Sequence, residues 1–289
     1  MGNIFAMVTL KSSNFYTSYA IKSFFDNTNL ESDDEFLLIN NDKCKIEKYF
    51  TFGKINIIEN KKALSFGQNV NQIIKLAINK KKNLIFLNND IIFTKNWFHS
   101  LSSNNNNISI PVNNQLFRYE SDCGSLKLKA TMKLDDFNEN YNLLNDIVNK
   151  HKKKYKPDQK FQTLLMPFFC FKIPLTILSD IGYFDESFVD GGEDIDYRIR
   201  CAVKGYEVNF LLDSYLLHFH GKSTWDGNET PNQTKLRNEN YTKAFLNKWQ
   251  HELTQIFLIR KDFLNILNKK KLQGFFNKGK FGELIRKLI

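Results

Sequence analysis

The sequence predicts an α/β fold, in which a mostly parallel sheet is sandwiched by helices and followed by a C-terminal helical extension. Short apolar runs of strand length alternate with amphipathic stretches of helical period along most of the chain. Two of these runs end in the same polar triplet, Asn-Asn-Asp, and beyond Trp225 only helical periodicity remains. Strands that alternate with helices are joined by right-handed crossovers, which place the strands in parallel and the helices on both faces of the sheet.

The N-terminal part of the chain contains the clearest elements. Residues 4–10 form an apolar run bounded by polar residues, which is typical of a buried parallel strand. Apolar side chains at helical spacing predict helices over 16–25 and 68–79. Further strands are predicted over 35–39, 55–58 and 83–87. The last of these and the strand over 35–39 are followed by the two Asn-Asn-Asp triplets, at the sheet edge where ligands of such folds gather.

The elements of the second half are less regular. Residues 102–107 are rich in asparagine and predict a surface loop, and the stretch from 104 to 160 contains no motif. A helix is expected over 138–154, because its basic end suits the negative pole of the helix dipole. The other expected elements are a buried strand over 164–171, helices over 174–181 and 193–204, strands over 207–212 and 214–217, and helices only from 233 onward.

Composition limits the classes of protein and of partner. The chain has 289 residues, of which 42% are hydrophobic and 14% aromatic, so it can bury a sizeable core and is not disordered. The net charge of +10 suits nucleic acid, an anionic membrane or a phosphorylated substrate, but much of it follows Trp249, which argues against a nucleic-acid groove across the fold. Four scattered cysteines favour neither zinc nor disulfides and indicate a reducing, cytoplasmic setting. We expect neither a signal peptide nor a membrane span.

A cluster of carboxylates surrounds the glycine pair Gly191-Gly192, just before the helix expected over 193–204. A helix N-terminus favours negative charge, but this cluster exceeds what capping requires. We therefore predict that it is the catalytic edge of an enzyme. Asp194, on the first turn of the helix, is the candidate general base, and Glu193 would orient it or hold the acceptor. The remaining acids that we expect to be structural are Asp185, Glu186 and Asp196.

Asp90, His218 and His220 are the candidate metal ligands. Asp90 ends a strand whose apolar residues fix its position, and Mg²⁺ and Mn²⁺ prefer hard oxygen ligands. The two histidines lie at i and i+2, so they point the same way in an extended segment. Each has a structural alternative, a turn cap for Asp90 and a satisfied structural role for either histidine. Asp42 is a candidate for contact with a base or ribose, and its alternative is an Asx turn.

These residues resemble the motifs of the family 2 glycosyltransferases, and the resemblance covers roughly residues 4 to 225. The matching segments are Asn40-Asn41-Asp42, the helix start at Ser65 to Ile74, Asn88-Asn89-Asp90, Ile181 to Phe188, Glu193-Asp194-Ile195-Asp196 and His218 to Ser223. In the family these positions hold a Val-Asp-Asn turn, a Gly-Phe-Ala-x-Ala-x-Asn helix start, Asp-x-Asp, Val-Gly-Gly-Phe-Asp-Glu-x-Phe, Glu-Asp-x-Asp and His-x-x-Gly-x-Ser. The chain departs from the family at Asn88, where an acid is usual.

The resemblance implies a GT-A fold and transfer of a sugar, with inversion, from a nucleotide-diphosphate sugar to an acceptor hydroxyl. Asp90 and His218 would hold Mn²⁺ or Mg²⁺ on the diphosphate, and Asp194 would take the acceptor proton. The residues that it implies for binding the nucleotide sugar are Thr9, Asp42, Asn71, Asn89, Lys222 and Ser223, and His220 would contact the metal or the diphosphate. The acceptor would be a glycan or a lipid-linked glycan of cell-surface polysaccharide synthesis.

Two units are expected, a GT-A-like domain over 1–226 and a basic, amphipathic helical extension over 227–289. In the extension, lysines alternate with leucine and phenylalanine. This pattern suits contact with the inner face of an anionic membrane. The alternative is a helix packed on the domain with a solvated outer face, and we favour membrane contact slightly because enzymes of the resembled family often use lipid-linked acceptors. For the function, the alternatives are a non-catalytic sugar-nucleotide or glycan-binding module and, third, a nucleotidyltransferase. No nucleic-acid partner is expected.

Overall fold

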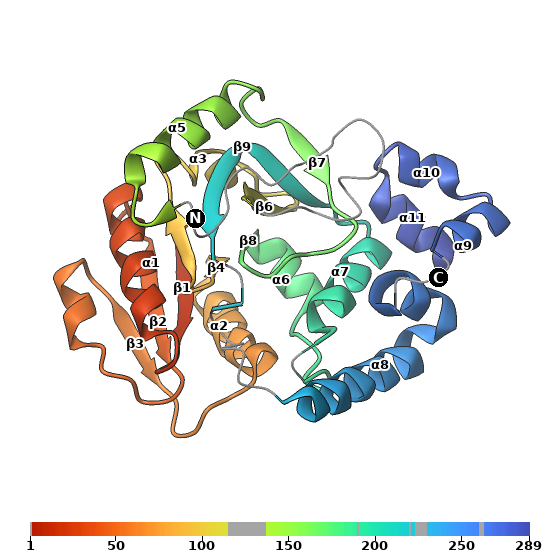
Figure 1. Cartoon of the computed structure of the whole chain (residues 1–289), viewed down its shortest axis with the longest axis horizontal. Coiled ribbons are helices and arrows are strands. Elements are labelled where there is room, and N and C mark those ends of the chain that lie inside the picture. The colour runs from red at the N-terminus through yellow and green to blue at the C-terminus, as the bar shows by residue number, and fades with distance from the viewer. Residues whose placement is uncertain (1, 115–136, 190, 220, 223–229, 260–262) are drawn as a thin grey trace.

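The computed structural model describes residues 2–114, 137–189, 191–219, 221–222, 230–259 and 263–289. One twisted sheet runs through the molecule, and the helices that follow β9 gather along one side of it (Figure 1). Its strand order is β3-β2-β1-β4-β8-β6-β9-β5, and β7 pairs with β9. The strands are β1 (Asn3–Thr9), β2 (Glu35–Asn40), β3 (Asn56–Glu59), β4 (Asn83–Leu87), β5 (Ile91–Phe93), β6 (Ile108–Asn113), β7 (Lys160–Gln162), β8 (Cys170–Ile173) and β9 (Val208–His218).

The expected α/β class is confirmed. Strands β3, β2, β1 and β4 are parallel to one another, so their carboxyl ends lie at one edge of the sheet. Antiparallel pairing begins at β8, which lies between β4 and β6. The helices before the extension are α1 (Asn14–Asn27), α2 (Phe66–Lys80), α3 (His99–Ser103), α5 (Tyr141–Lys152), α6 (Leu175–Ile181) and α7 (Glu193–Val203), with a 3-10 turn, η1 (Glu47–Thr51).

Helix α2 illustrates how the sequence sets an element. Ser65 accepts a hydrogen bond from the Gln68 amide while the Gln68 side chain accepts one from the Ser65 amide, a capping box that starts the helix. The predicted apolar face is buried, with Val70, Ile73 and Ala77 all at 0% exposure. The helix therefore packs on the sheet with its N-terminus at the edge where the strands end.

Five elements form the C-terminal part of the chain. They are α8 (Pro231–Thr254), the π-helical turn η2 (Gln255–Ile259), α9 (Phe263–Lys269), α10 (Gln273–Asn277) and α11 (Phe281–Leu288). Their apolar side chains form a second core with Leu164, Phe188, Ile195 and Ile199, of which the last two belong to α7. Phe281, Leu284 and Ile285 are fully buried in it, so most of the amphipathic pattern of the extension faces the protein interior.

Several predictions of individual elements were wrong. The apolar stretch 164–171 is not one strand, because only Cys170 onward joins the sheet, as β8. Its residues are apolar for another reason: Leu164 lies in the second core, whereas Met166 and Phe169 lie in the first. Pro167, between them, has no amide to donate to a ladder. The strands predicted over 207–217 are one strand, β9.

Three elements between 88 and 114 were not predicted from the pattern. They are β5 and α3, which precede the stretch from 104 to 160, and β6 within it, which pairs in parallel with β9. Helix α3 extends to Ser103, into the loop predicted over 102–107. The helix expected over 138–154 is shorter, as α5, and is capped by the Asn140 side chain. Among the described residues, no helix combines the length and the apolar composition that a membrane span needs.

Candidate active site

A cavity of about 420 Å³ lies at the carboxyl ends of β1 and β4, beside the start of α2. Its described lining contains no charged side chain. It consists of Val8, Leu10, Ser12, Asn41, Ala63, Leu64, Ser65, Phe66, Asn69, Phe86, Leu87, Asn88, Asn89 and Val189. Aromatic and aliphatic walls with a few amides are typical of small-molecule sites. The cavity is therefore suited to a flat, polar ring system more than to a charged group.

A network of side-chain amides fixes one wall of this cavity. Asn60 donates to Asn41 at 2.7 Å and to Asn69 at 2.8 Å, and Gln72 donates to Asn60 at 3.2 Å. Asn41 also donates to the Leu64 carbonyl at 3.0 Å. Because each amide is held by its neighbours, the orientation of Asn41 and Asn69 at the cavity wall is set before any ligand binds.

Three residues that were predicted to bind the nucleotide sugar, Thr9, Asp42 and Asn89, form hydrogen bonds that hold the loops around the cavity. Both oxygens of Asp42 accept from the Lys11 amide at 2.9 Å, so this carboxylate ties the end of β2 to the loop after β1. Asn89 donates to Thr17 at 2.9 Å, and Thr17 lies 3.0 Å from the hydroxyl of Thr9. Asn89 lines the cavity, whereas Thr9 and Asp42 are not among its lining residues.

Asp90 and His218 come together from distant parts of the chain. Strand β5 pairs antiparallel with β9 so that Ile91 is opposite His218, which brings Nε2 of His218 to 3.3 Å from Oδ1 of Asp90. Asp90 is fully buried, and its Oδ2 accepts from the Lys222 amide at 3.0 Å. Burial opposes ionisation, but the His218 ring and this amide outweigh it, so the pKa of Asp90 lies below its ordinary value.

The His218 ring is held in place on its other side. It stacks on Phe169 with ring centroids 5.1 Å apart, and its backbone amide donates to Asn114 at 2.8 Å. The Asn88 amide in turn donates to the Phe169 carbonyl at 2.7 Å. The Asp90–His218 pair therefore has a fixed geometry next to the Asn88 side of the cavity.

This pair fits a divalent cation. Oδ1 of Asp90 is buried and accepts no hydrogen bond from any residue that the structure describes, although it faces Nε2 of His218. One carboxylate and one imidazole form a usual Mn²⁺ donor set when substrate oxygens complete the shell. No group of three or more His, Cys, Asp or Glu ligands occurs among the described residues. The predicted contacts His220 and Ser223 lie outside those residues.

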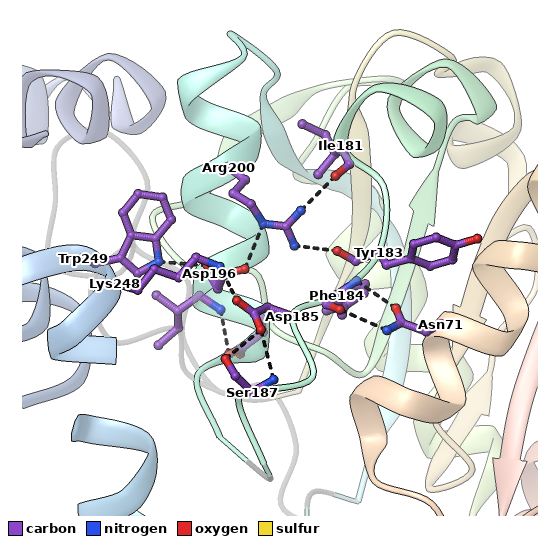
Figure 2. Close-up of polar contacts among 12 residues, drawn as sticks. Asn71, Ile181, Tyr183, Phe184, Asp185, Ser187, Asp196, Arg200, Lys248 and Trp249 are labelled. Atoms are coloured by element: carbon purple, nitrogen blue, oxygen red, sulfur yellow. Dashed lines mark hydrogen bonds and ion pairs between the residues drawn. The ribbon is translucent and has the colours of Figure 1, made fainter. Parts of the chain in front are cut away.

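The segment between α6 and α7, of which residues 182–189 and 191–192 are described, contains Asp185 and Glu186 and is called the acidic turn here. Hydrogen bonds connect it to α2. Asn71 accepts from the Phe184 amide at 2.8 Å and donates to the Phe184 carbonyl at 3.0 Å (Figure 2). It also donates to Glu186 at 2.7 Å. Asn71 was predicted to bind the nucleotide sugar. It is not among the described residues that line the cavity, and its side chain holds the turn, so its role toward the nucleotide sugar stays a prediction.

The acids expected to be structural all have protein partners, although only Asp196 is fully buried. Figure 2 shows Asp185 and Asp196 converging on Lys248 of α8. Arg200 donates to Asp196 and to the carbonyls of Ile181 and Tyr183, each at 2.9 Å. Burial would raise the pKa of Asp185, but Lys248 and Ser187 lower it to about 2.

The two candidate catalytic acids begin α7. The helix starts after Gly192, whose φ of +87° lies in the left-handed region that glycine tolerates, and it has no side-chain cap of its own. Glu193 is 6% exposed, whereas Asp194 is partly exposed. Of the two, Asp194 is therefore the more accessible to an acceptor.

No family model and no curated protein matches the chain, but solved structures do. GalNAc-T7 with UDP, GalNAc and Mn²⁺ matches with a TM-score of 0.58 and 13% identity over 94% of this chain and 55% of that one. TarS 1–349 of S. aureus with UDP-GlcNAc matches at 0.54 and 11%, over 100% and 90% of the two chains. The mannosyltransferase PcManGT of Pyrobaculum calidifontis with GDP-Man and Mn²⁺ matches at 0.51 and 9%, over 99% and 85%.

The chain has the GT-A glycosyltransferase fold. On this GT-A sheet, the cavity and the Asp90–His218 pair share the edge at which β1 and β4 end. The sequence did not predict a role for Lys248 and Trp249 of α8. They lie on the same helical face as Tyr241 and Phe245, and this spacing indicates a contact surface only once α8 is known to lie against the acidic turn.

Proposed function

We propose that this protein is an inverting glycosyltransferase that moves a sugar from a nucleotide-diphosphate sugar to an acceptor hydroxyl. The observation that carries the proposal is the uncharged cavity of about 420 Å³ with the buried Asp90–His218 pair nearby, on a GT-A sheet. Solved neighbours of the same fold hold UDP, UDP-GlcNAc or GDP-Man, and two of them hold Mn²⁺.

In the proposed complex the nucleoside occupies the cavity and the diphosphate extends toward Asp90. Asn41 and Asn69 form a wall of this cavity that is held by their hydrogen bonds to Asn60 and Leu64, and Phe66 offers an aromatic wall. Thr9, Asp42, Asn71 and Asn89 support this site through the loops and helix starts that they join. Lys222, whose side chain is exposed beside Asp90, and Ser223 are proposed to contact the diphosphate.

A divalent ion, Mn²⁺ or Mg²⁺, bound by Asp90 and His218 would offset the charge of the departing nucleoside diphosphate. We include His220 in this ligand set as predicted. The protein supplies a buried carboxylate whose lowered pKa keeps it ionised and an imidazole held by stacking on Phe169. Both groups are in place in the free protein, so ligand binding does not have to assemble them.

Asp194 is proposed as the general base. The acceptor oxygen attacks the anomeric carbon, its proton passes to the Asp194 carboxylate, and the bond from that carbon to the diphosphate oxygen breaks. Attack from the face opposite the leaving group inverts the configuration. Glu193 would orient Asp194 or hold the acceptor.

The finer parts of the proposal concern family, substrate and place. We propose membership of the family 2 glycosyltransferases, hexosyl transfer, a glycan or lipid-linked acceptor of cell-surface polysaccharide synthesis, and a cytoplasmic site of action. Contact with an anionic membrane would rest on the exposed lysines of the extension, such as Lys269, Lys271 and Lys287, because most of its apolar side chains are buried. Sedimentation with phosphatidylserine vesicles should then be lost at high salt and absent with neutral lipid.

The test of the function is release of UDP or GDP from UDP-GlcNAc, UDP-GalNAc and GDP-mannose, with and without Mn²⁺. We expect release from one donor, a loss of roughly 10³-fold or more in Asp194→Asn, and a comparable loss in Asp90→Ala. Wild-type turnover in Asp194→Asn would reject the base assignment, and absence of UDP and GDP binding would reject the proposal as a whole.

One observation favours a second candidate, a non-catalytic sugar-nucleotide or glycan-binding module. Asn88, which lines the cavity, stands where the family usually has the first acid of Asp-x-Asp. Such a module would bind UDP or GDP, seen as a rise in unfolding temperature, yet release nothing from any of the three donors.

A further inference from the structure

We propose that helix α8 of the extension is part of the catalytic apparatus, and that Lys248 and Trp249 are positioning residues that fix the acidic turn so that Asp194 meets the acceptor. The inference rests on the proposed role of Asp194. It assigns to the extension a function that the GT-A fold alone does not provide.

One face of α8 contacts the turn at several of its described residues. Tyr241, Phe245, Lys248 and Trp249 recur at i, i+4, i+7 and i+8, so they share one side of the helix. A Cβ at Gly191 would lie 2.4 Å from the Tyr241 ring. The first glycine of the turn therefore allows α8 to approach the backbone as closely as it does.

The next glycine of the pair is enclosed in a similar way. A Cβ at Gly192 would lie 3.3 Å from Phe188 and 3.7 Å from Phe245, and the positive φ of this residue disfavours any other side chain. Phe188 and Phe245 are themselves buried in the second core, with ring centroids 6.0 Å apart. The start of α7 is thus packed against a rigid part of the extension.

Polar contacts continue this interface along α7. The Asp196 side chain is completely buried, and its Oδ1 is 2.7 Å from Nζ of Lys248 and accepts from Nε1 of Trp249 at 2.9 Å. Lys248 also pairs with Asp185, on the other arm of the turn. One ammonium group therefore joins both arms, and its loss would leave the buried Asp196 carboxylate with Arg200 as its cationic partner and Asp185 without Lys248.

These contacts act on Asp194 through the backbone. Asp194 and Asp196 share the first turn of α7, and their side chains point in directions about 200° apart around the helix axis. The contacts of Lys248 and Trp249 with Asp196, which we call the clamp, therefore restrain this helical turn on the side opposite Asp194. On this side of the turn, Asp196 is held by Arg200 of α7 and by Lys248 and Trp249 of α8, so α8 supplies the restraint that comes from outside the helix. A displacement of about 1 Å at a reacting group can lower a rate roughly 100-fold.

The test compares four α8 variants in the full-length protein. Lys248→Met keeps the alkyl stem and removes the charge, Trp249→Phe removes one donor, Lys248→Arg preserves donors, and Lys243→Met is the control at an exposed position of the same helix. With UDP-GlcNAc, UDP-GalNAc or GDP-mannose and Mn²⁺, we expect Lys248→Met to lower kcat roughly 10- to 100-fold with donor KM within about twofold of wild type. Trp249→Phe should show a smaller loss, Lys248→Arg should recover most of kcat, and Lys243→Met should match wild type.

A double variant separates positioning from general damage. In the Asp194→Asn background, Lys248→Met should lower kcat by less than about twofold, because the residue through which it acts is already disabled. A full additional loss there would overturn the proposal. Wild-type activity of Asp194→Asn would instead reject the base assignment, a distinct result that concerns the proposed function.

Amide exchange provides a readout without turnover. The amides of residues 191–196 should exchange faster with deuterium in Lys248→Met than in Lys243→Met, while those of β1 and β4 remain unchanged. Equal exchange of 191–196 in these two variants would overturn the clamp, whatever the activity.

Discussion

At the scale of single residues, the Asp90–His218 pair shows how a buried carboxylate is stabilised by its neighbours. Asp90 is fully buried, yet its carboxylate has the Lys222 amide on one oxygen and faces His218 with the other. A buried carboxylate that loses such a partner is costly, whereas removal of both partners is tolerated better. This asymmetry allows the proposed metal role and the structural role of His218 to be measured separately.

His218→Phe retains the stacking on Phe169 but removes Nε2. We expect it to lower the free energy of unfolding by about 1–3 kcal/mol, and to abolish the rise in melting temperature that Mn²⁺ with UDP produces in the wild type. Denaturant unfolding and thermal melts check the two effects. Adding Asp90→Leu should restore stability without restoring the Mn²⁺ effect. A variant that stays fully responsive to Mn²⁺ would exclude His218 from the ligand set.

At the scale of elements, Lys172 of β8 closes the end of α3. Its buried ammonium donates to the carbonyls of Leu101 and Ser102 at 2.8 and 3.0 Å and to Asn105 at 2.9 Å. Free carbonyls at a helix C-terminus attract a cation. Burial lowers the pKa of Lys172 from 10.5 to about 8.

This burial predicts a pH dependence of stability. Between pH 8 and 10.5 the unfolded chain holds the Lys172 proton more tightly than the folded chain, so stability rises with pH across that window. The free energy of unfolding of wild type minus that of Lys172→Met should increase by up to about 1.4 kcal/mol per pH unit there. Urea titrations of both proteins from pH 7 to pH 10 measure it. A difference that does not vary with pH would contradict the lowered pKa.

Also at this scale, the sequence predicted elements well where one periodicity dominated. Helix α2 and strands β1, β2 and β4 lie within a residue or two of their predicted ranges. Strands β5 and β6 were missed because a run as short as Ile91–Phe93 has no detectable period, and Ile108–Asn113 is buried on both faces. The stretch 164–171 misled because it supplies side chains to two cores, so apolar character there did not mean a strand.

The sequence could predict those residues of the candidate site that directly follow a strand, because the end of the strand places them at the sheet edge. The approach of Asp90 to His218 follows from the pairing of β5 with β9, which no local pattern revealed. Asn71 was expected at the ligand because of its position in a motif, but its amide is engaged by the backbone of Phe184. Lys248 could not be placed because its partners lie in a distant segment of the sequence.

At the scale of the whole molecule, the second core determines how independent the extension is. The predicted boundary between residues 226 and 227 places α7 in the domain and α8 to α11 in the extension. Buried side chains of α7 and of α8 to α11 nevertheless belong to one apolar cluster. Domains that fold alone have a core of their own. We therefore expect the two parts to unfold together.

Phe281→Ala tests this expectation. Phe281 is fully buried between Phe161 and Phe276, with ring centroids 6.1 and 5.9 Å away. Its truncation should destabilise the entire chain by about 3–5 kcal/mol in a single transition. Leu264→Ala, at a site that is 54% exposed, is the control and should have little effect. Two separate transitions in the Phe281 variant would support an extension that folds by itself.

The second core also sets the order in which the protein can be completed during its synthesis. The chain emerges from the ribosome N-terminus first, so the sheet and the Asp90–His218 pair can begin to form while the extension is still being made, and the second core stabilises them later. The acidic turn can be enclosed only later, after Tyr241, Lys248 and Trp249 have been synthesised and have packed against it. In a nascent chain the cavity would thus take shape before the proposed general base is fixed, and the proposed transfer would become possible only when the extension docks.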